Sequence, residues 1–180
     1  MQKRFFDNQS TQSLVPELPA GTFAFGEKYV KSKVITLPGH STSCFISGRF
    51  DMVARFEDNT YGVLDFKTSE PRESNTEKYR RQLHAYTYAL ENPAPNSFSL
   101  SPVSLLGLLV LDPSKMVSGQ SGKGYFIKCE PTWIPFTRND DEFMSFIAEV
   151  LTVLEMPEPP RASPSCGFCN YREQARQSNY

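Results

Sequence analysis

The sequence predicts an α/β domain built on a mixed central β-sheet flanked by helices. Two observations support this fold class. The predicted elements follow the order strand, strand, strand, helix, strand, strand, helix, which is typical of α/β and α+β folds. Residues 103–112 form a continuous apolar run of strand length, which suits a central strand buried on both faces. The chain has 180 residues, 39% of them hydrophobic, so we expect one domain over 1–180.

The N-terminal half predicts three strands. Residues 1–26 contain two prolines and two glycines, and we expect a loosely structured lead-in there. The β-branched residues in 28–37 predict a first strand, and alternation over 43–58 predicts a second. The turn "EDNT" joins the second strand to "YGVLDFKT", so we expect these two to pair antiparallel.

The C-terminal half predicts two helices and two further strands. Residues 75–92 lack glycine and proline and place apolar residues at helical spacing, with Asn75 or Thr76 as N-cap. The remaining predictions, in chain order, are the buried strand over 103–112 ending at Pro113, a strand over 125–136 interrupted at Pro131, an amphipathic helix over 139–156, and a Pro-rich tail over 157–180 that closes with a short helix.

Charge and hydropathy restrict the classes of partner. The formal net charge of -1 gives no global basic field, so it neither suggests nor excludes binding to a polyanion. No apolar run approaches the roughly 20 residues that span a bilayer, and the N-terminus lacks the apolar stretch of a signal peptide. We expect no membrane association and an intracellular protein, either cytoplasmic or in an organelle or nucleus of a eukaryote.

Three charged residues interrupt apolar strands where a buried unpaired charge is costly. Asp51 and Asp65 fall on strands predicted to be neighbours, and two close carboxylates repel unless a cation lies between them. Mg²⁺ prefers such oxygen ligands. Alternation places Asp65 and Lys67 on one face, while Phe66 offers its backbone carbonyl to the site. Two carboxylates that hold a metal ion and a nearby lysine are the groups that metal-assisted phosphodiester hydrolysis uses. The alternative is a structural salt bridge at a sheet end, with Lys67 neutralising one of the acids.

The predicted helix over 75–92 adds two polar side chains. Gln82 and Tyr86 are four residues apart and therefore share a helix face. Pointed at the carboxylates, they could bind a phosphate, a base or a metal-bound water. The alternative is an ordinary amphipathic helix with Tyr86 in the core and Gln82 at its boundary. His84 and His40 are interpreted as packing or surface residues and receive no catalytic role.

The motifs "GRFD", "VLDFKT" and "QLHAY" occur in one order over about residues 27–92. This series resembles the G-x-x-D, D-x-K and Q-x-x-x-Y motifs of the RecB-like branch of the PD-(D/E)xK nuclease superfamily, which includes phage, CRISPR-associated and mitochondrial genome-maintenance exonucleases. The resemblance implies a restriction-endonuclease-like core. It also implies that Asp51 and Asp65 bind Mg²⁺ or Mn²⁺, that Lys67 is the catalytic lysine, and that Gln82 and Tyr86 support the site.

The expected function is therefore metal-dependent DNA cleavage, most simply by an exonuclease acting on DNA ends or single strands. The lead-in departs from the family, whose members carry an N-terminal helix with a metal-facing Glu; Glu27 is the candidate here. If that helix is missing, the site is open, incomplete or completed by another chain. The alternative is a weakly active or inactive nuclease-fold subunit that binds DNA or regulates a recombination, repair or CRISPR-adaptation complex.

The C-terminal cysteines are a second departure from the family. Iron-sulfur members of this branch end in C-x-x-C-x5-C and use one further upstream cysteine. This chain keeps Cys166 and Cys169 but has Ala175 at the third position. An iron-sulfur cluster or zinc ion would have to recruit Cys44 and Cys129, and we expect neither at this pair.

Overall fold

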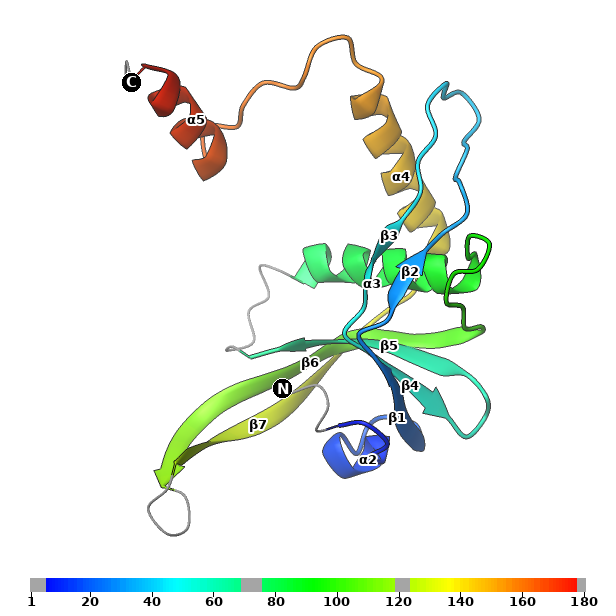
Figure 1. The fold of residues 1–180 in the computed structure, drawn as a ribbon, viewed down its shortest axis with the longest axis vertical. Helices are drawn as coiled ribbons and strands as arrows, with labels where there is room; N and C mark the ends of the chain where they lie inside the picture. Colours follow the sequence, from blue (N-terminus) through cyan, green and yellow to red (C-terminus); the bar gives the residue numbers. More distant parts are fainter. Residues whose placement is uncertain (1–5, 69–75, 119–123, 178–180) are drawn as a thin grey trace.

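The central sheet has five strands and mixed topology (Figure 1). The computed structural model describes residues 6–68, 76–118 and 124–177. β5 and β6 pair in parallel through the α3 crossover, and the other neighbours pair antiparallel. The α/β prediction is confirmed. In sheet order the strands are β1 (Gly21–Gly26), β4 (Met52–Phe56), β5 (Tyr61–Lys67), β6 (Val103–Ser118) and β7 (Tyr125–Phe136).

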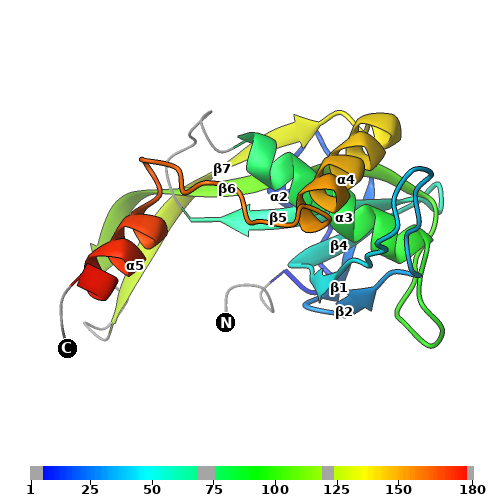
Figure 2. The same ribbon diagram turned by 90° about the horizontal axis from the view of Figure 1, so that it is seen from above.

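Helices α3 (Thr76–Glu91) and α4 (Asp140–Leu154) lie on one side of the sheet, and the short α2 (Thr11–Leu14) lies beside β1 (Figures 1 and 2). Side chains alternate along β6, so its neighbouring residues enter different cores. Leu108 and Val110 pack in the cluster that contains Leu83 of α3, whereas Leu109 packs with Phe23 of β1. The predicted burial of this strand on both faces is confirmed over its first part.

The two strands predicted over 28–37 and 43–58 are much shorter than expected. β2 (Tyr29–Lys31) pairs with β3 (Ser47–Arg49) in a separate two-stranded sheet. The chain bends at Asp51 before β4 begins and joins the central sheet there. The alternation over 43–58 predicts one strand, but its first half pairs with β2 and its second half pairs with β1 and β5.

The expectation of a loosely structured lead-in over 1–26 is wrong for the described part of that segment. Residues of β1 pair with β4 from Gly21 opposite Phe56 to Gly26 opposite Met52. Val15 and Leu18 are buried in the same cluster as Phe23. Burial of these apolar side chains against the open face of the sheet orders a segment whose prolines and glycines predict turns.

The predicted stops at Pro113 and Pro131 do not occur. β6 continues to Ser118 with a register shift between Pro113 and Lys115, and β7 runs without a break through Pro131. β7 is an edge strand, and a proline on an edge strand can turn its missing N–H side to solvent. We call residues 113–118 and 125–130 the β arm.

The predicted helices agree well with the structure. α3 covers 76–91, so Thr76 is helical, while Asn75 lies outside the described residues. α4 begins after Asn139, whose side chain accepts the N–H of Glu142 at 3.1 Å. The tail ends in α5 (Gly167–Gln177), as expected. None of the helices among the described residues is long and apolar enough to cross a bilayer.

Candidate active site

Asp51 and Asp65 meet at the end of β5. Asp51 lies in the bend before β4, and its Oδ2 accepts the N–H of Phe66 at 3.1 Å. Asp65 points toward α3 from β5 and is 3% exposed. Burial raises the pKa of the Asp65 carboxyl, the Lys67 ammonium lowers it, and the charge of Asp51 raises it further. The two carboxylates therefore interact, as the sequence predicts.

Lys67 lies on the same side of β5 as Asp65. Its Nζ is 2.5 Å from Oδ2 of Asp65 and 4.4 Å from the ring centroid of Tyr79. The Asp65 contact has ion-pair distance, but Oδ2 is buried and accepts no hydrogen bond of normal geometry. The ammonium is thus held between the Asp65 carboxylate and the aromatic face of Tyr79.

Gln82 and Tyr86 connect α3 to this carboxylate. Gln82 Nε2 donates to Asp65 Oδ1 at 3.4 Å and lies 3.4 Å from the Tyr86 hydroxyl. Tyr86 also packs closely on Gly48 of β3, where an added Cβ would lie 2.9 Å from Cε1 of the ring. The three predicted motifs therefore touch one another: Gly48 contacts Tyr86, and Gln82 contacts both Tyr86 and Asp65.

The salt bridge of the alternative interpretation is present, but it does not balance the charges. Asp51 and Asp65 bring two carboxylates, and Lys67 brings one positive charge. Two neighbouring carboxylates, one of them buried, fit the hard oxygen ligands that Mg²⁺ and Mn²⁺ use. Within residues 6–68, 76–118 and 124–177, no group of three or more His, Cys, Asp or Glu side chains could hold a metal ion.

Glu27, the predicted third acid, lies beside Asp51 through its backbone. Its N–H donates to the carbonyl of Asp51 at 3.1 Å, and it adopts a left-handed conformation with φ 50°. The carboxylate does not form a three-acid group with Asp51 and Asp65 in the described chain. Glu27 therefore marks the edge of the site, and its role as a ligand stays a prediction.

Two aromatic neighbours of the site were not predicted to be part of it. Tyr79 lies under the Lys67 ammonium, and its place on α3, three residues before Gln82, could have indicated this. Phe6 stacks on Phe66 with ring centroids 5.0 Å apart and an interplanar angle of 11°. No local pattern indicates this contact, because Phe6 and Phe66 are distant in sequence.

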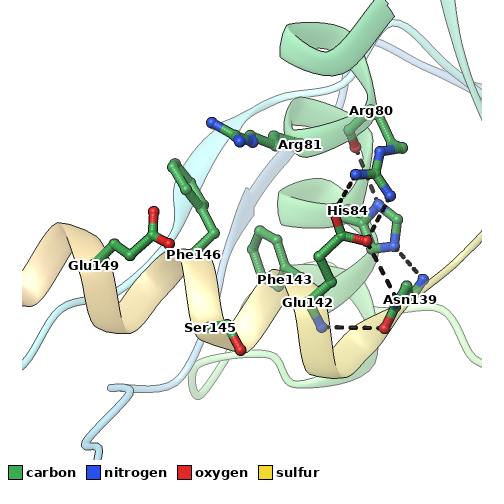
Figure 3. A pocket seen from close by; sticks show the side chains of 9 residues that line it. All are labelled: Arg80, Arg81, His84, Asn139, Glu142, Phe143, Ser145, Phe146 and Glu149. Carbon is green, nitrogen blue, oxygen red and sulfur yellow. Dashed lines mark hydrogen bonds and ion pairs between the residues drawn. The ribbon is translucent and has the colours of Figure 1, made fainter.

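A separate cavity of about 140 Å³ lies between α3 and α4 (Figure 3). None of the predicted site residues lines it. Arg80 forms ion pairs with Glu77 on its own helix and with Glu142 of α4. His84 accepts the N–H of Asn139 on Nε2, and its Nδ1 lies 3.1 Å from the carbonyl of Arg80. The Nε2 contact joins the start of α4 to α3, and the Nδ1 contact lies within α3, so both nitrogens of His84 have structural partners, as expected of a packing residue.

The cysteine pair begins α5. The N–H of Cys169 donates to Sγ of Cys166 at 3.5 Å, which lowers the pKa of the Cys166 thiol, while the neighbouring thiol raises that of Cys169. Cys44 and Cys129 lie on other segments, and the described residues contain no metal-binding group formed by these cysteines. What binds at Cys166 and Cys169, if anything, stays a prediction.

Comparison with known proteins identifies the family of this chain. A sequence profile of the PD-(D/E)XK nuclease superfamily matches residues 7–174. The chain belongs to the PD-(D/E)XK nuclease superfamily. Members are generally metal-dependent phosphodiester hydrolases that act on nucleic acid and typically use Mg²⁺ or Mn²⁺. The observed sheet and flanking helices are consistent with the restriction-endonuclease-like fold of this superfamily.

Matches to individual proteins are more distant. No curated protein matches the chain. Four chains among the solved structures match. One of them, described as the crystal structure of SSO0001, is 17% identical with a TM-score of 0.47, and the alignment covers 83% of this chain and 58% of that chain. The chain therefore spans less than two thirds of that protein's length.

Proposed function

We propose that this protein is a metal-dependent deoxyribonuclease of the RecB-like branch, acting as an exonuclease on DNA ends or single strands. The convergence of Asp51, Asp65 and Lys67 around the Phe66 peptide supports it most directly, because it gathers the groups that phosphodiester hydrolysis requires. The order of the three sequence motifs supports the RecB-like assignment.

The acidic residues have the role of ligands in this proposal. Asp51 and Asp65 hold Mg²⁺ or Mn²⁺, with the carbonyl of Phe66 as a further oxygen ligand. When bound, such an ion supplies a Lewis acid and lowers the pKa of a coordinated water. The N–H of Phe66 donates to Oδ2 of Asp51 and so orients that carboxylate beside Asp65.

The remaining residues position charge and the acid. Lys67 Nζ, held between Asp65 and Tyr79, places a positive charge where negative charge develops on the phosphate. Gln82 orients Asp65 through Oδ1, and Tyr86 supports Gln82. Gln82 thus holds Oδ1 from the helix, while Lys67 pairs with Oδ2.

A second candidate is a nuclease-fold subunit that binds DNA without efficient turnover. The observation that favours it is the presence of two, rather than three, converging acids in the described part of the chain. A partner chain that supplied another acidic side chain would complete the site in this case.

The test is cleavage of end-labelled single- and double-stranded DNA, linear and circular, with Mg²⁺, Mn²⁺ or EDTA. We expect metal-dependent degradation that Asp51→Ala, Asp65→Ala and Lys67→Ala each reduce about 100-fold or more. Asp141→Ala and Lys33→Ala remove exposed charges elsewhere and serve as matched controls.

The circular substrates separate exonuclease from endonuclease action, because an exonuclease spares a closed circle. Full activity of Asp65→Ala or Lys67→Ala would contradict the mechanism. A folded wild-type protein that binds DNA and leaves every substrate intact would favour the binding-subunit candidate.

A further inference from the structure

The β arm extends the central sheet past the candidate active site. Val110 of β6 is the parallel partner of Lys67, the last residue of β5. β6 then continues to Ser118, and Lys115 lies about 17 Å further along the strand at a rise of about 3.3 Å per residue. Figures 1 and 2 show β6 and β7 projecting together beyond the other strands. A strand of nucleic acid leaving the site in this direction would meet the arm.

The register places one row of arm side chains on the face of the catalytic groups. Asp65 and Lys67 pair with residues 108 and 110 of β6, whose β7 partners are Ile134 and Thr132. Side chains alternate along β7, and therefore Glu130, Lys128 and Phe126 follow on the same face. The face of each arm residue is assigned along β7, because the register shift lies on β6, between Pro113 and Lys115.

Charged residues of the same sign lie opposite one another on the two strands of the arm. Lys128 lies directly opposite Lys115, and like charges opposite one another on neighbouring strands are destabilising. Nζ of Lys128 is 3.9 Å from Glu130, an exposed ion pair of little energetic value, and Glu130 itself faces Asp112. A bound phosphate would relieve the lysine repulsion that Glu130 offsets in part.

Exposed aromatic and aliphatic side chains continue beyond the lysines. Phe126 is 64% exposed, and Val117 lies opposite it. Tyr125 on the other face is 74% exposed. Proteins that bind single-stranded nucleic acid combine basic side chains along the backbone with aromatic rings that stack on bases. The arm has both, next to the site where a strand would be cleaved.

We propose that the β arm binds the single-stranded nucleic acid that extends from the active site, with Lys115 and Lys128 contacting phosphates and Phe126 stacking on a base. This inference rests on the proposed nuclease function. In this proposal the arm holds a long substrate, and Asp51, Asp65 and Lys67 carry out the hydrolysis.

The first experiment measures binding of fluorescein-labelled oligothymidine by anisotropy in EDTA, using the full chain. We expect Phe126→Ala to weaken binding roughly 5- to 150-fold, the range of one base–aromatic stack. Loss of two phosphate contacts in the Lys115→Ala/Lys128→Ala variant should make the negative slope of log affinity against log salt shallower by about 1.4. Lys33→Ala/Arg55→Ala removes the same charge from exposed positions away from the arm and is the matched control.

The second experiment separates the arm from the active site. Thymidine 5′-p-nitrophenyl phosphate is too short to reach the arm, so the arm variants should hydrolyse it with Mn²⁺ at the wild-type rate while degrading long single strands more slowly. If the wild type hydrolyses neither substrate, the proposed function fails, and the binding measurement still decides the role of the arm.

Two outcomes would overturn the inference. One is oligothymidine binding that Phe126→Ala and the double lysine variant leave equal to that of the control. The other is an unchanged affinity together with loss of a wild-type oligomer in sedimentation experiments, which would make the arm a protein interface. The substituted side chains are exposed, and circular dichroism checks that the variants keep the wild-type fold.

Discussion

Substitution of Gly48 by alanine tests whether the three motifs act as one packed unit. Gly48 pairs with Val30 in the small sheet, and its backbone conformation does not require glycine. The constraint is instead the ring of Tyr86: an alanine Cβ would lie 2.9 Å from Cε1, 3.5 Å from the hydroxyl and 3.6 Å from Cζ. Because carbon atoms in contact lie about 3.5 Å apart or more, the ring must move by about 0.6 Å.

The displacement should affect both stability and cleavage. Overpacking of this size reduces the free energy of unfolding by about 1–3 kcal/mol. The contacts from the Tyr86 hydroxyl to Gln82 and from Gln82 to Asp65 are each 3.4 Å, already long for hydrogen bonds. A shift of the ring therefore breaks the chain of contacts, and we expect cleavage to fall roughly 10- to 100-fold.

Urea unfolding and cleavage of labelled DNA measure the two effects. In a Tyr86→Leu background, which removes the ring, Gly48→Ala should change stability by less than about 0.5 kcal/mol. Gly167→Ala is the matched control, because an added Cβ there meets nothing within 4 Å. Wild-type stability and cleavage of Gly48→Ala would refute the argument that the glycine positions Tyr86.

Three further predictions concern stability. Arg138→Lys loses the two-point contact with Glu91 at 2.7 and 3.1 Å and should reduce the free energy of unfolding in urea by about 1–3 kcal/mol; an unchanged unfolding midpoint would contradict this. The Thr42 N–H is the main cause that lowers the pKa of Glu155 from 4.5 to about 2, so the ionised carboxylate stabilises the fold above pH 4.5 and this stabilisation is lost as the pH falls toward 2. Melting temperatures of wild type and Glu155→Gln should therefore converge at low pH, and a pH-independent difference would exclude this linkage. Leu109→Ala opens a cavity at a fully buried position and should cost about 2–5 kcal/mol in the same urea assay, where a smaller loss would mean that the core collapses around it.

Much of the candidate site could be predicted because its residues follow local rules. Alternation along β5 puts Asp65 and Lys67 on one face, and the helical repeat puts Gln82 and Tyr86 on another common face. The close packing of Gly48 against Tyr86 could not be predicted, because it depends on how β3 approaches α3. The contact between Phe6 and Phe66 is likewise set by the path of the N-terminal segment.

The sequence by itself determined the order of the elements from β5 onward, the strand buried on both faces, both long helices and the residues of the motifs, because each depends on periodicity and composition over a short window. The tertiary structure alone decided how strands end and pair. It divides the segment over 43–58 at Asp51, adds β1 to the edge of the sheet, and carries β6 past Pro113. Each outcome depends on hydrogen-bond partners and buried area contributed by distant residues, and no local pattern contains that information.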